Sequence, residues 1–296
     1  MPNTLAHIGT QGLISSGLFR KIDLKWVLLG CILPDIPWII RRTVLASGMP
    51  VSLYDLQLYA IGQSSLFGTI FLAIAVSTFS KNFKRVFFIL SFNIILHLLL
   101  DSLQVKWGSG VHLLAPFDWK MLSFDLFWPE SIPSILMTAA GVFFIAYACI
   151  KFPVTPGDLV LPKGKYSVVF AVSIIAYFSL PIALKSMPER ADNQFLKTHR
   201  QVELRRDRPI EFERRPFYHK DGKCVIKTIA NEELAVYGME KNCSGVYSAQ
   251  AVFLNERDMQ VIRFHRHWDV YRSTLSYVGL FFIGIYWFRS IKLHRF

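Results

Sequence analysis

The sequence contains few charged residues for its length. Charged residues make up 18% of the 296 residues, hydrophobic residues make up 52%, and 25 residues are Phe. An ordinary soluble domain has about 25% charged residues, so this composition argues against that class. Together with apolar runs such as "VFFILSFNIIL", it predicts a polytopic membrane protein.

Acidic residues are scarce beside basic ones, 21 against 33, which gives a formal net charge of +12. Such an excess can indicate nucleic-acid binding. The chain has no basic helix and no repeat of basic and aromatic residues, so we expect no nucleic-acid partner. Most Lys and Arg residues lie in short connections between apolar segments, as the positive-inside rule predicts for a membrane protein.

Cysteine is rare, with four residues. Cys31 and Cys149 lie in apolar runs, and we expect them to pack as inert side chains. Cys224 and Cys243 lie in a polar segment and can form a disulfide if that segment is outside the cytoplasm. The N-terminal stretch lacks the basic start of a cleavable signal peptide, and the chain shows no internal repeat and no low-complexity tract.

Seven apolar segments follow one another, and the first two are weak by length and polarity. They cover about residues 4–19, 26–40, 60–79, 86–103, 131–150, 166–185 and 274–289. We therefore expect an all-α bundle of about five to seven membrane helices, of which the first two can be short or re-entrant.

Basic clusters predict the orientation of this bundle. If each segment crosses once, four clusters fall on one side, which is then the cytoplasm, and Arg41 and Arg42 are exceptions on the other side. The clusters are Arg20, Lys21 and Lys25; Lys81, Lys84 and Arg85; Lys151, Lys163 and Lys165; and Arg289, Lys292 and Arg295.

The polar region between the last two apolar segments reads as short β-strands separated by turn residues. The strand candidates are "IEFERRPFY", "CVIKTI", "LAVYGM", "VYSAQAVFL" and "MQVIRF". We expect a membrane domain over residues 1–186, a small extracytoplasmic β-rich domain over 187–272, and a final helix with a basic cytoplasmic tail over 273–296. A disulfide between Cys224 and Cys243 fits this location.

Five polar residues in or beside apolar segments fall on one membrane face in this topology: His7, Asp35, His97, Asp101 and His112. Ionisable groups at membrane depth usually face a protein interior and carry a function. His97 and Asp101 are four residues apart, so they share one helix face. Imidazole and carboxylate groups together suit zinc, manganese or iron. We expect the first four residues to be metal ligands, and His112 to be a ligand or a general acid/base.

A structural interpretation stays open for each of these residues. His97 and Asp101 can instead form a buried hydrogen-bonded pair that holds helices together. A surface role is the expected one for His265 and His267, which alternate along a predicted strand. The basic run of residues 205–215 can face lipid headgroups or an anionic substrate, but such runs usually form a solvated face.

Four motifs occur in order within residues 1–150: "NTLAHIG", "GCILPDIPW", "HLLLD" and "GSGVHLLAPF". They resemble the Thr-His, Pro-Asp, His-three-residues-Asp and Gly-rich-loop motifs of the YdjM-like, or DUF457, family of bacterial inner-membrane metal-dependent hydrolases. That family carries a His-Arg-Gly…Thr-His-Ser element where this chain has "IGQSSLFGTI". Ser65 matches the final serine, whereas Gln63 and Ser64 stand where histidine is expected.

The resemblance implies a multi-pass inner-membrane hydrolase that cleaves an ester or phosphoester of a lipid-like or envelope substrate at the outer face. In this interpretation a divalent ion, first of all zinc, activates water. His112 and Ser65 are the catalytic candidates. Gln63 and Ser64 are expected to form hydrogen bonds with the metal ligands or the substrate. The expected partners are membrane lipids and, through the β-rich domain, a protein.

Two other classes of function stay open. The chain can be a non-catalytic relative that uses the polar cluster for structure and the β-rich domain for envelope assembly. It can also be a component of a transporter or flippase, with intramembrane charges along a path. A path would need polar residues through the whole membrane depth, and here they crowd at one face.

Overall fold

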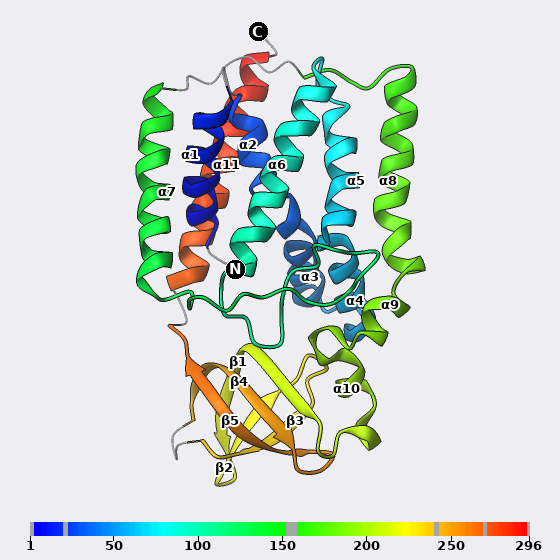
Figure 1. Ribbon diagram of the computed structural model, residues 1–296, viewed down its shortest axis with the longest axis vertical. Coiled ribbons are helices and arrows are strands. Elements are labelled where there is room, and N and C mark those ends of the chain that lie inside the picture. The colour runs from blue at the N-terminus through cyan, green and yellow to red at the C-terminus, as the bar shows by residue number, and fades with distance from the viewer. Residues whose placement is uncertain (1–2, 20–22, 152–158, 240–242, 269–270, 295–296) are drawn as a thin grey trace.

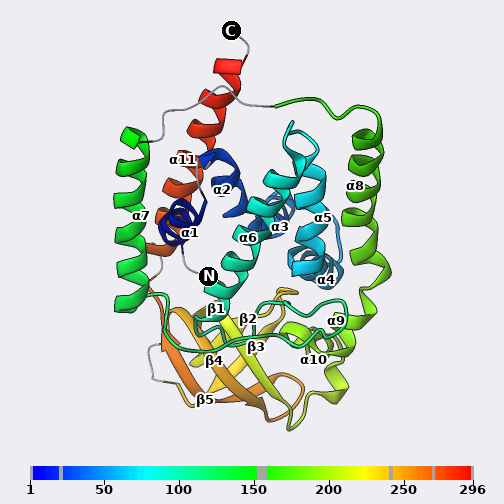
Figure 2. The ribbon, with the colours of Figure 1, turned by 45° about the horizontal axis from the view of Figure 1, so that its top comes forward.

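The computed structural model describes residues 3–19, 23–151, 159–239, 243–268 and 271–294. It consists of a helical bundle stacked end to end on a small β-barrel (Figures 1 and 2). The bundle contains both the first helix and the last, so the barrel is inserted between two helices of the same bundle. This arrangement agrees with the predicted order of the three parts of the chain.

Four helices in the described part of the chain are long and apolar enough to cross a membrane. They are α6 (Phe83–Ser102), α7 (Ile132–Lys151), α8 (Lys165–Ala183) with the short α9 (Ser186–Arg190) that continues it, and α11 (Tyr271–His294). A fifth span results if α4 (Leu53–Ser64) and α5 (Leu66–Ser77), which meet at an angle of 64°, count as one. The structure therefore has the composition of a multi-pass membrane protein.

The outer faces of these helices carry large apolar side chains. Phe143 of α7 is 75% exposed, Ile150 is 86% exposed, and Phe281 of α11 is 71% exposed. Apolar patches of this extent are unusual on soluble monomers. In a bilayer they would face lipid tails, which explains why these helices lack the polar face of a soluble helix.

The first two predicted segments form short pieces. α1 (Thr4–Leu18) has 15 residues, and the second segment divides into α2 (Leu24–Gly30), the 3₁₀ turn η1 (Leu33–Asp35) and α3 (Ile36–Ala46). Prolines in the first turns of η1 and α3 account for this division, because proline is tolerated at a helix start and disrupts a helix interior.

The short helix α1 lies inside the bundle, between α7 and α11 (Figure 1). A Cβ atom on Gly9 would lie only 2.3 Å from the backbone nitrogen of Gly141 in α7. The two helix backbones are therefore in direct contact, as in other membrane helix pairs with small residues at the interface. This packing explains how a helix carrying several polar residues is buried on nearly all sides.

The basic clusters meet at the end of the bundle farthest from the barrel. The turn between α5 and α6, the end of α7, the start of α8 and the end of α11 all lie there (Figure 1). This is the arrangement that the charge pattern predicts. Arg20, Lys21 and Arg295 lie outside the described residues.

All five predicted strands are present, and they close into a barrel in the order β1-β2-β3-β5-β4. β3 and β5 are parallel, and the other pairs are antiparallel. This order is that of the five-stranded Greek-key barrel of the OB type. The strands are β1 (Pro209–Lys220), β2 (Lys223–Lys227), β3 (Glu233–Tyr237), β4 (Gly245–Phe253) and β5 (Asp258–Arg266).

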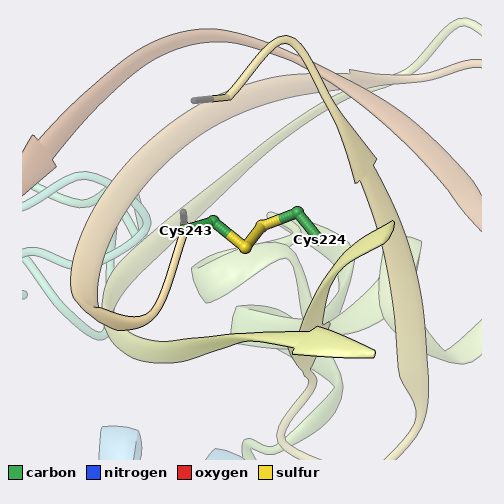
Figure 3. Close-up of a disulfide and its surroundings, with 2 residues drawn as sticks. All are labelled: Cys224 and Cys243. Atoms are coloured by element: carbon green, nitrogen blue, oxygen red, sulfur yellow. A yellow bond between two sulfur atoms is a disulfide. The ribbon is translucent and has the colours of Figure 1, made fainter. Parts of the chain in front are cut away.

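A disulfide joins Cys224 to Cys243, as predicted, with a distance of 6.0 Å between the Cα atoms (Figure 3). Cys224 lies in β2, and Cys243 lies just before β4, so the bond links two parts of the barrel that are not neighbouring strands. Both cysteines belong to the apolar core of the barrel.

The region before the barrel is helical, contrary to the expectation of a β-rich domain from residue 187 onward. It contains part of α9, η2 (Asn193–Phe195), α10 (Leu196–Arg200) and η3 (Val202–Leu204). These turns lie against the barrel and the end of α4 (Figures 1 and 2). A second connection, residues 103–131, runs between bundle and barrel. There the Gly108 N–H donates to Oε2 of Glu211 in β1 at 2.7 Å.

Candidate metal centre

Three separate parts of the chain bring imidazole and carboxylate groups together inside the bundle. His7 lies in α1, Asp35 ends η1, and His97 and Asp101 lie one turn apart in α6. His7, His97 and Asp101 are at most 1% exposed. Because α1 packs beside α6, residues nearly a hundred positions apart in the sequence become neighbours.

Three of these side chains are within reach of one ion, and Asp35 lies beside His97. His7 Nε2 lies 3.3 Å from Asp101 Oδ1, and His97 Nε2 lies 3.7 Å from Asp35 Oδ1 and 3.9 Å from Asp101 Oδ2. The two imidazole rings stack, with centroids 4.0 Å apart. Ligand atoms of His7, His97 and Asp101 all lie within 4.8 Å of one another, so these three residues could hold a metal ion.

The proton positions on the two histidines suit this role. His97 Nδ1 lies 2.7 Å from the Cys31 carbonyl oxygen and donates to it, which leaves a lone pair on Nε2. His7 Nδ1 lies 3.0 Å from the side-chain amide of Gln11, whose oxygen has no other partner in the described part of the chain. In this orientation the amide nitrogen donates to Nδ1 and the proton of neutral His7 lies on Nε2, so the metal-binding tautomer requires the amide to be turned over. With its oxygen toward Nδ1, His7 also offers a lone pair on Nε2.

Buried atoms without hydrogen bonds mark the centre. Among the described residues, His7 Nε2, His97 Nε2, Asp35 Oδ1 and Asp101 Oδ1 have no hydrogen-bond partner. Leaving a buried polar atom unpaired costs about 1–3 kcal/mol, and His7, His97 and Asp101 lie where one metal ion could join them. Two imidazole nitrogens and two carboxylate oxygens are ligands that zinc accepts, and manganese or iron also suits them.

Lys106 is a charged neighbour that the sequence analysis missed. It lies in the connection after α6, is 5% exposed, and its Nζ is 3.0 Å from Asp101 Oδ2. Gln11, which orients His7, was also missed. His7 and Gln11 are four residues apart, the same spacing that places His97 and Asp101 on one helix face. This spacing could have predicted the contact between His7 and Gln11.

A cavity of about 660 Å³ lies beside the cluster. Its wall includes Asp35, Asp101 and Lys106, and it continues between the bundle and the barrel. The wall also contains arginines from three elements. They are Arg41 and Arg42 of α3, Arg214 and Arg215 of β1, and Arg272 of α11.

His112 lines the same cavity but is outside the metal cluster. It is 2% exposed, and its Nε2 has no partner among the described residues. Burial lowers the pKa of His112 to about 4. The side chain is therefore neutral near pH 7, and it can form hydrogen bonds with a ligand in the cavity.

The Gln63–Ser65 segment lies at the break between α4 and α5. Ser65 is the N-cap of α5: its Oγ accepts from the Gly68 N–H and donates to the Gly62 carbonyl. Gln63 donates to the Tyr59 hydroxyl. Neither lines the cavity, whereas Ser64 does. Ser65 is thus engaged as a helix cap, and we leave it out of the proposed chemistry.

A second cluster corrects the expected surface role of His265 and His267. His267 is 5% exposed, and its Nδ1 lies 2.9 Å from Glu130 Oε1. His265 Nε2 lies 3.7 Å from Glu130 Oε2. These three residues could also hold a metal ion, although the Arg214 guanidinium already donates to Glu130 at 2.7 Å. Glu130 precedes α7, His265 lies near the end of β5 and His267 follows that strand, so this cluster joins the barrel to the bundle.

The basic run of residues 205–215 is not the uniformly solvated face that was expected. Arg205 is fully buried and donates to both carboxylate oxygens of Glu232, at 2.7 and 2.6 Å. It also packs against the Phe253 ring. A buried guanidinium needs a bidentate partner of this kind, and no sequence pattern predicts that Glu232 lies near it.

The motifs that carry the family resemblance now have positions in the structure. His7, Asp35, His97 and Asp101 meet at one centre, and the segment 63–65 lies outside it. No family model, no curated protein and no solved structure matches the chain.

Proposed function

We propose that this protein is a membrane-bound, metal-dependent hydrolase of an ester or phosphoester in a lipid-like or envelope substrate. The observation that carries the proposal is the convergence of four buried, unpaired donor atoms from His7, Asp35, His97 and Asp101. The resemblance to the YdjM-like family supports the same assignment. In this proposal the centre lies toward the outer face of the bacterial inner membrane, the face predicted from the basic clusters.

A divalent ion bound by these residues supplies Lewis-acid chemistry, which polarises the scissile group and makes water a better nucleophile near neutral pH. Asp101 and Asp35 provide the negative charge that holds the ion. The Cys31 carbonyl and Gln11 orient the two imidazoles, and such outer contacts are important for metal affinity.

The residues around the centre have separate roles in hydrolysis. The ammonium group of Lys106 is positioned to stabilise negative charge that develops on the substrate. His112, neutral at pH 7, forms a hydrogen bond with the attacking water or the leaving group. The cavity admits substrate from the boundary between bundle and barrel.

The test is the metal content of the full chain purified in a mild neutral detergent without chelators, beside an Asp101→Asn variant. Asn keeps the size and hydrogen-bonding ability of the side chain but lacks the anionic oxygen that a cation needs. We expect wild type to contain close to one equivalent of metal, and Asp101→Asn to lose affinity by more than the roughly 10–100-fold typical of outer-shell changes.

The matched control is Asp207→Asn, the same substitution at a side chain that is 85% exposed. It should retain metal and hydrolytic activity. A wild-type protein that binds none of zinc, manganese or iron, or an Asp101→Asn variant with normal metal content, contradicts the proposal.

A further inference from the structure

The cavity beside the metal centre carries positive charge that the chain itself leaves unbalanced. Arg41, Arg42, Arg215 and Arg272 line it. None of these four guanidinium groups forms an ion pair within the described residues. Arg42 is exposed and the other three are half-buried, so these groups are accessible to an anion, which they would hold by charge-assisted hydrogen bonds.

These groups come from different parts of the molecule but lie close together. Burial and the positive charges of Arg215 and Arg42 lower the pKa of Arg41 to about 10, although α3 belongs to the bundle and β1 to the barrel. The buried Nε of Arg41 has no hydrogen-bond partner in the described part of the chain. A buried N–H donor is thus available at the position where three guanidinium charges repel one another.

Carboxylates offset part of this charge. Glu213 lies near enough to Arg215 to raise its pKa, but burial has the larger effect, and the pKa of Arg215 remains below its usual value. Asp35, Asp101 and Glu211 line the same cavity, so four carboxylates face six Lys and Arg side chains and the balance of the wall stays positive. The remaining charge favours a ligand with more than one negative charge, such as a phosphate ester, whose oxygens match the planar N–H pairs of arginine.

The other part of the same wall is apolar. Trp38 of α3, Leu98 of α6 and Leu280 of α11 line it. Tyr277 of α11 also lines the cavity and is 64% exposed on the outside of the bundle. The cavity therefore reaches the apolar outer surface of α11, and a ligand with a hydrocarbon tail can enter from the side while its head lies among the arginines.

We propose that the cavity binds the phosphate-bearing headgroup of an anionic amphiphile, held by Arg41 and Arg42 of the bundle and Arg215 of the barrel. This inference names the substrate class of the proposed hydrolase and, as far as turnover is concerned, rests on that function. The volume of about 660 Å³ suffices for a headgroup and the first part of its tails. Since β1 supplies one side of the clamp, the barrel takes part in recognising the substrate.

The experiment measures binding of four soluble probes to the full chain in a neutral sugar-headed detergent by calorimetry. The probes are dioctanoyl phosphatidic acid, dioctanoyl phosphatidylcholine, dioctanoylglycerol and inorganic phosphate. We expect phosphatidic acid to bind at least about tenfold more tightly than each of the other three, because only it combines a doubly charged phosphate with tails. If phosphatidylcholine binds equally well, the site does not select for negative charge. If inorganic phosphate binds equally well, the site does not recognise the tails. Either result overturns the proposal.

Two variants locate the site. Arg41→Gln and Arg215→Gln should each weaken phosphatidic acid binding about tenfold or more, as expected when a charge-assisted hydrogen bond is lost. Arg206→Gln is the matched control, because its side chain is 79% exposed outside the cavity. Should a Gln variant fail to fold, Arg41→Lys and Arg215→Lys keep the charge and lose the paired N–H groups, and they should show a smaller loss. Unchanged binding in folded Arg41 and Arg215 variants overturns the proposal.

The Asp101→Asn variant separates this inference from the proposed function. It should lack metal and turnover but still prefer phosphatidic acid over phosphatidylcholine, because the arginines that hold the headgroup are unchanged. Metal-dependent hydrolysis without preference for phosphatidic acid would leave the function standing and remove the headgroup site. Selective binding by a protein that takes up no metal would support the headgroup site and contradict the hydrolase.

Discussion

Lys106 sets the charge balance of the metal cluster. Its ammonium group lies 3.0 Å from Asp101 Oδ2, so it stabilises the anionic carboxylate but repels a dication bound there. We predict that Lys106→Met, which keeps most of the side-chain volume, binds zinc about tenfold or more tightly. Like charges about 4 Å apart repel by several kcal/mol even at an effective dielectric constant of about 20. Competition with a chelating dye measures the affinity.

The same substitution should lower turnover, because the positive group beside the developing charge is lost. Lys120→Met, at an exposed position in the same connection, is the matched control and should change neither quantity. Weaker zinc binding in Lys106→Met would show that the lysine supports the site rather than competes with the ion.

His199 makes the structure around the barrel sensitive to acid. Burial and the positive charges of Arg205 and Arg215 lower its pKa to about 3. An unfolded histidine has a pKa of about 6.5, so below that pH the unfolded chain binds a proton that the folded chain does not. Stability is therefore predicted to fall as the pH drops from about 6.5 toward 3.

The measurement is the midpoint of thermal unfolding of the full chain between pH 7.5 and pH 4. His199→Gln removes the titrating group and should make this decline shallower. Part of the decline in stability with falling pH should remain in this variant, because the pKa values of His112 and His267 are also lowered in the folded protein. An identical slope in wild type and His199→Gln would mean that the acid sensitivity arises elsewhere.

At the scale of single elements, the barrel depends on its disulfide. The bond between Cys224 and Cys243 spans 19 positions of the sequence, and closing a loop of that length is worth about 3 kcal/mol through the unfolded state. Replacing both cysteines by Ala should lower the free energy of barrel unfolding by about 2–4 kcal/mol. Denaturant unfolding of the full chain, followed with and without reductant, measures the effect.

The control is Cys149→Ala, because Cys149 is a free and exposed cysteine. Its stability should not differ from that of wild type, and reductant should shift the wild-type curve onto that of the double variant. A second measurement treats protein taken from membranes without reductant with a membrane-impermeant thiol reagent. If this reagent modifies both Cys224 and Cys243, the disulfide does not form in the cell and the prediction is wrong.

The elements themselves were largely predictable. Apolar runs of about 20 residues predict α6, α7, α8 and α11 because a helix of that length matches the apolar thickness of a bilayer. Alternation over short segments predicts all five strands of the barrel. The break between α4 and α5 was not predicted, because the apolar pattern continues through it. The break is produced by Ser65, which caps the start of α5.

At the scale of the whole molecule, the distribution of basic residues predicts which end of the bundle faces the cytoplasm. A reporter that is active only outside the cytoplasm should be active when fused after Ala230 in the barrel, and inactive when fused near Phe83 in the turn before α6. Paired measurement with a reporter that works only in the cytoplasm gives the complementary result. The reverse pattern would place the metal centre and the barrel on the cytoplasmic side.

The sequence by itself determined the helices, the strands, the disulfide pair and the residue types of a metal site, because these depend on local pattern and spacing. Only the tertiary structure decided that His7 lies beside Asp101, that Lys106 pairs with Asp101, and that Arg41 and Arg215 line one cavity from two parts of the molecule. It also decided that Glu130, His265 and His267 form a half-buried junction. Such contacts between distant residues depend on how helices and barrel pack, which no local periodicity encodes.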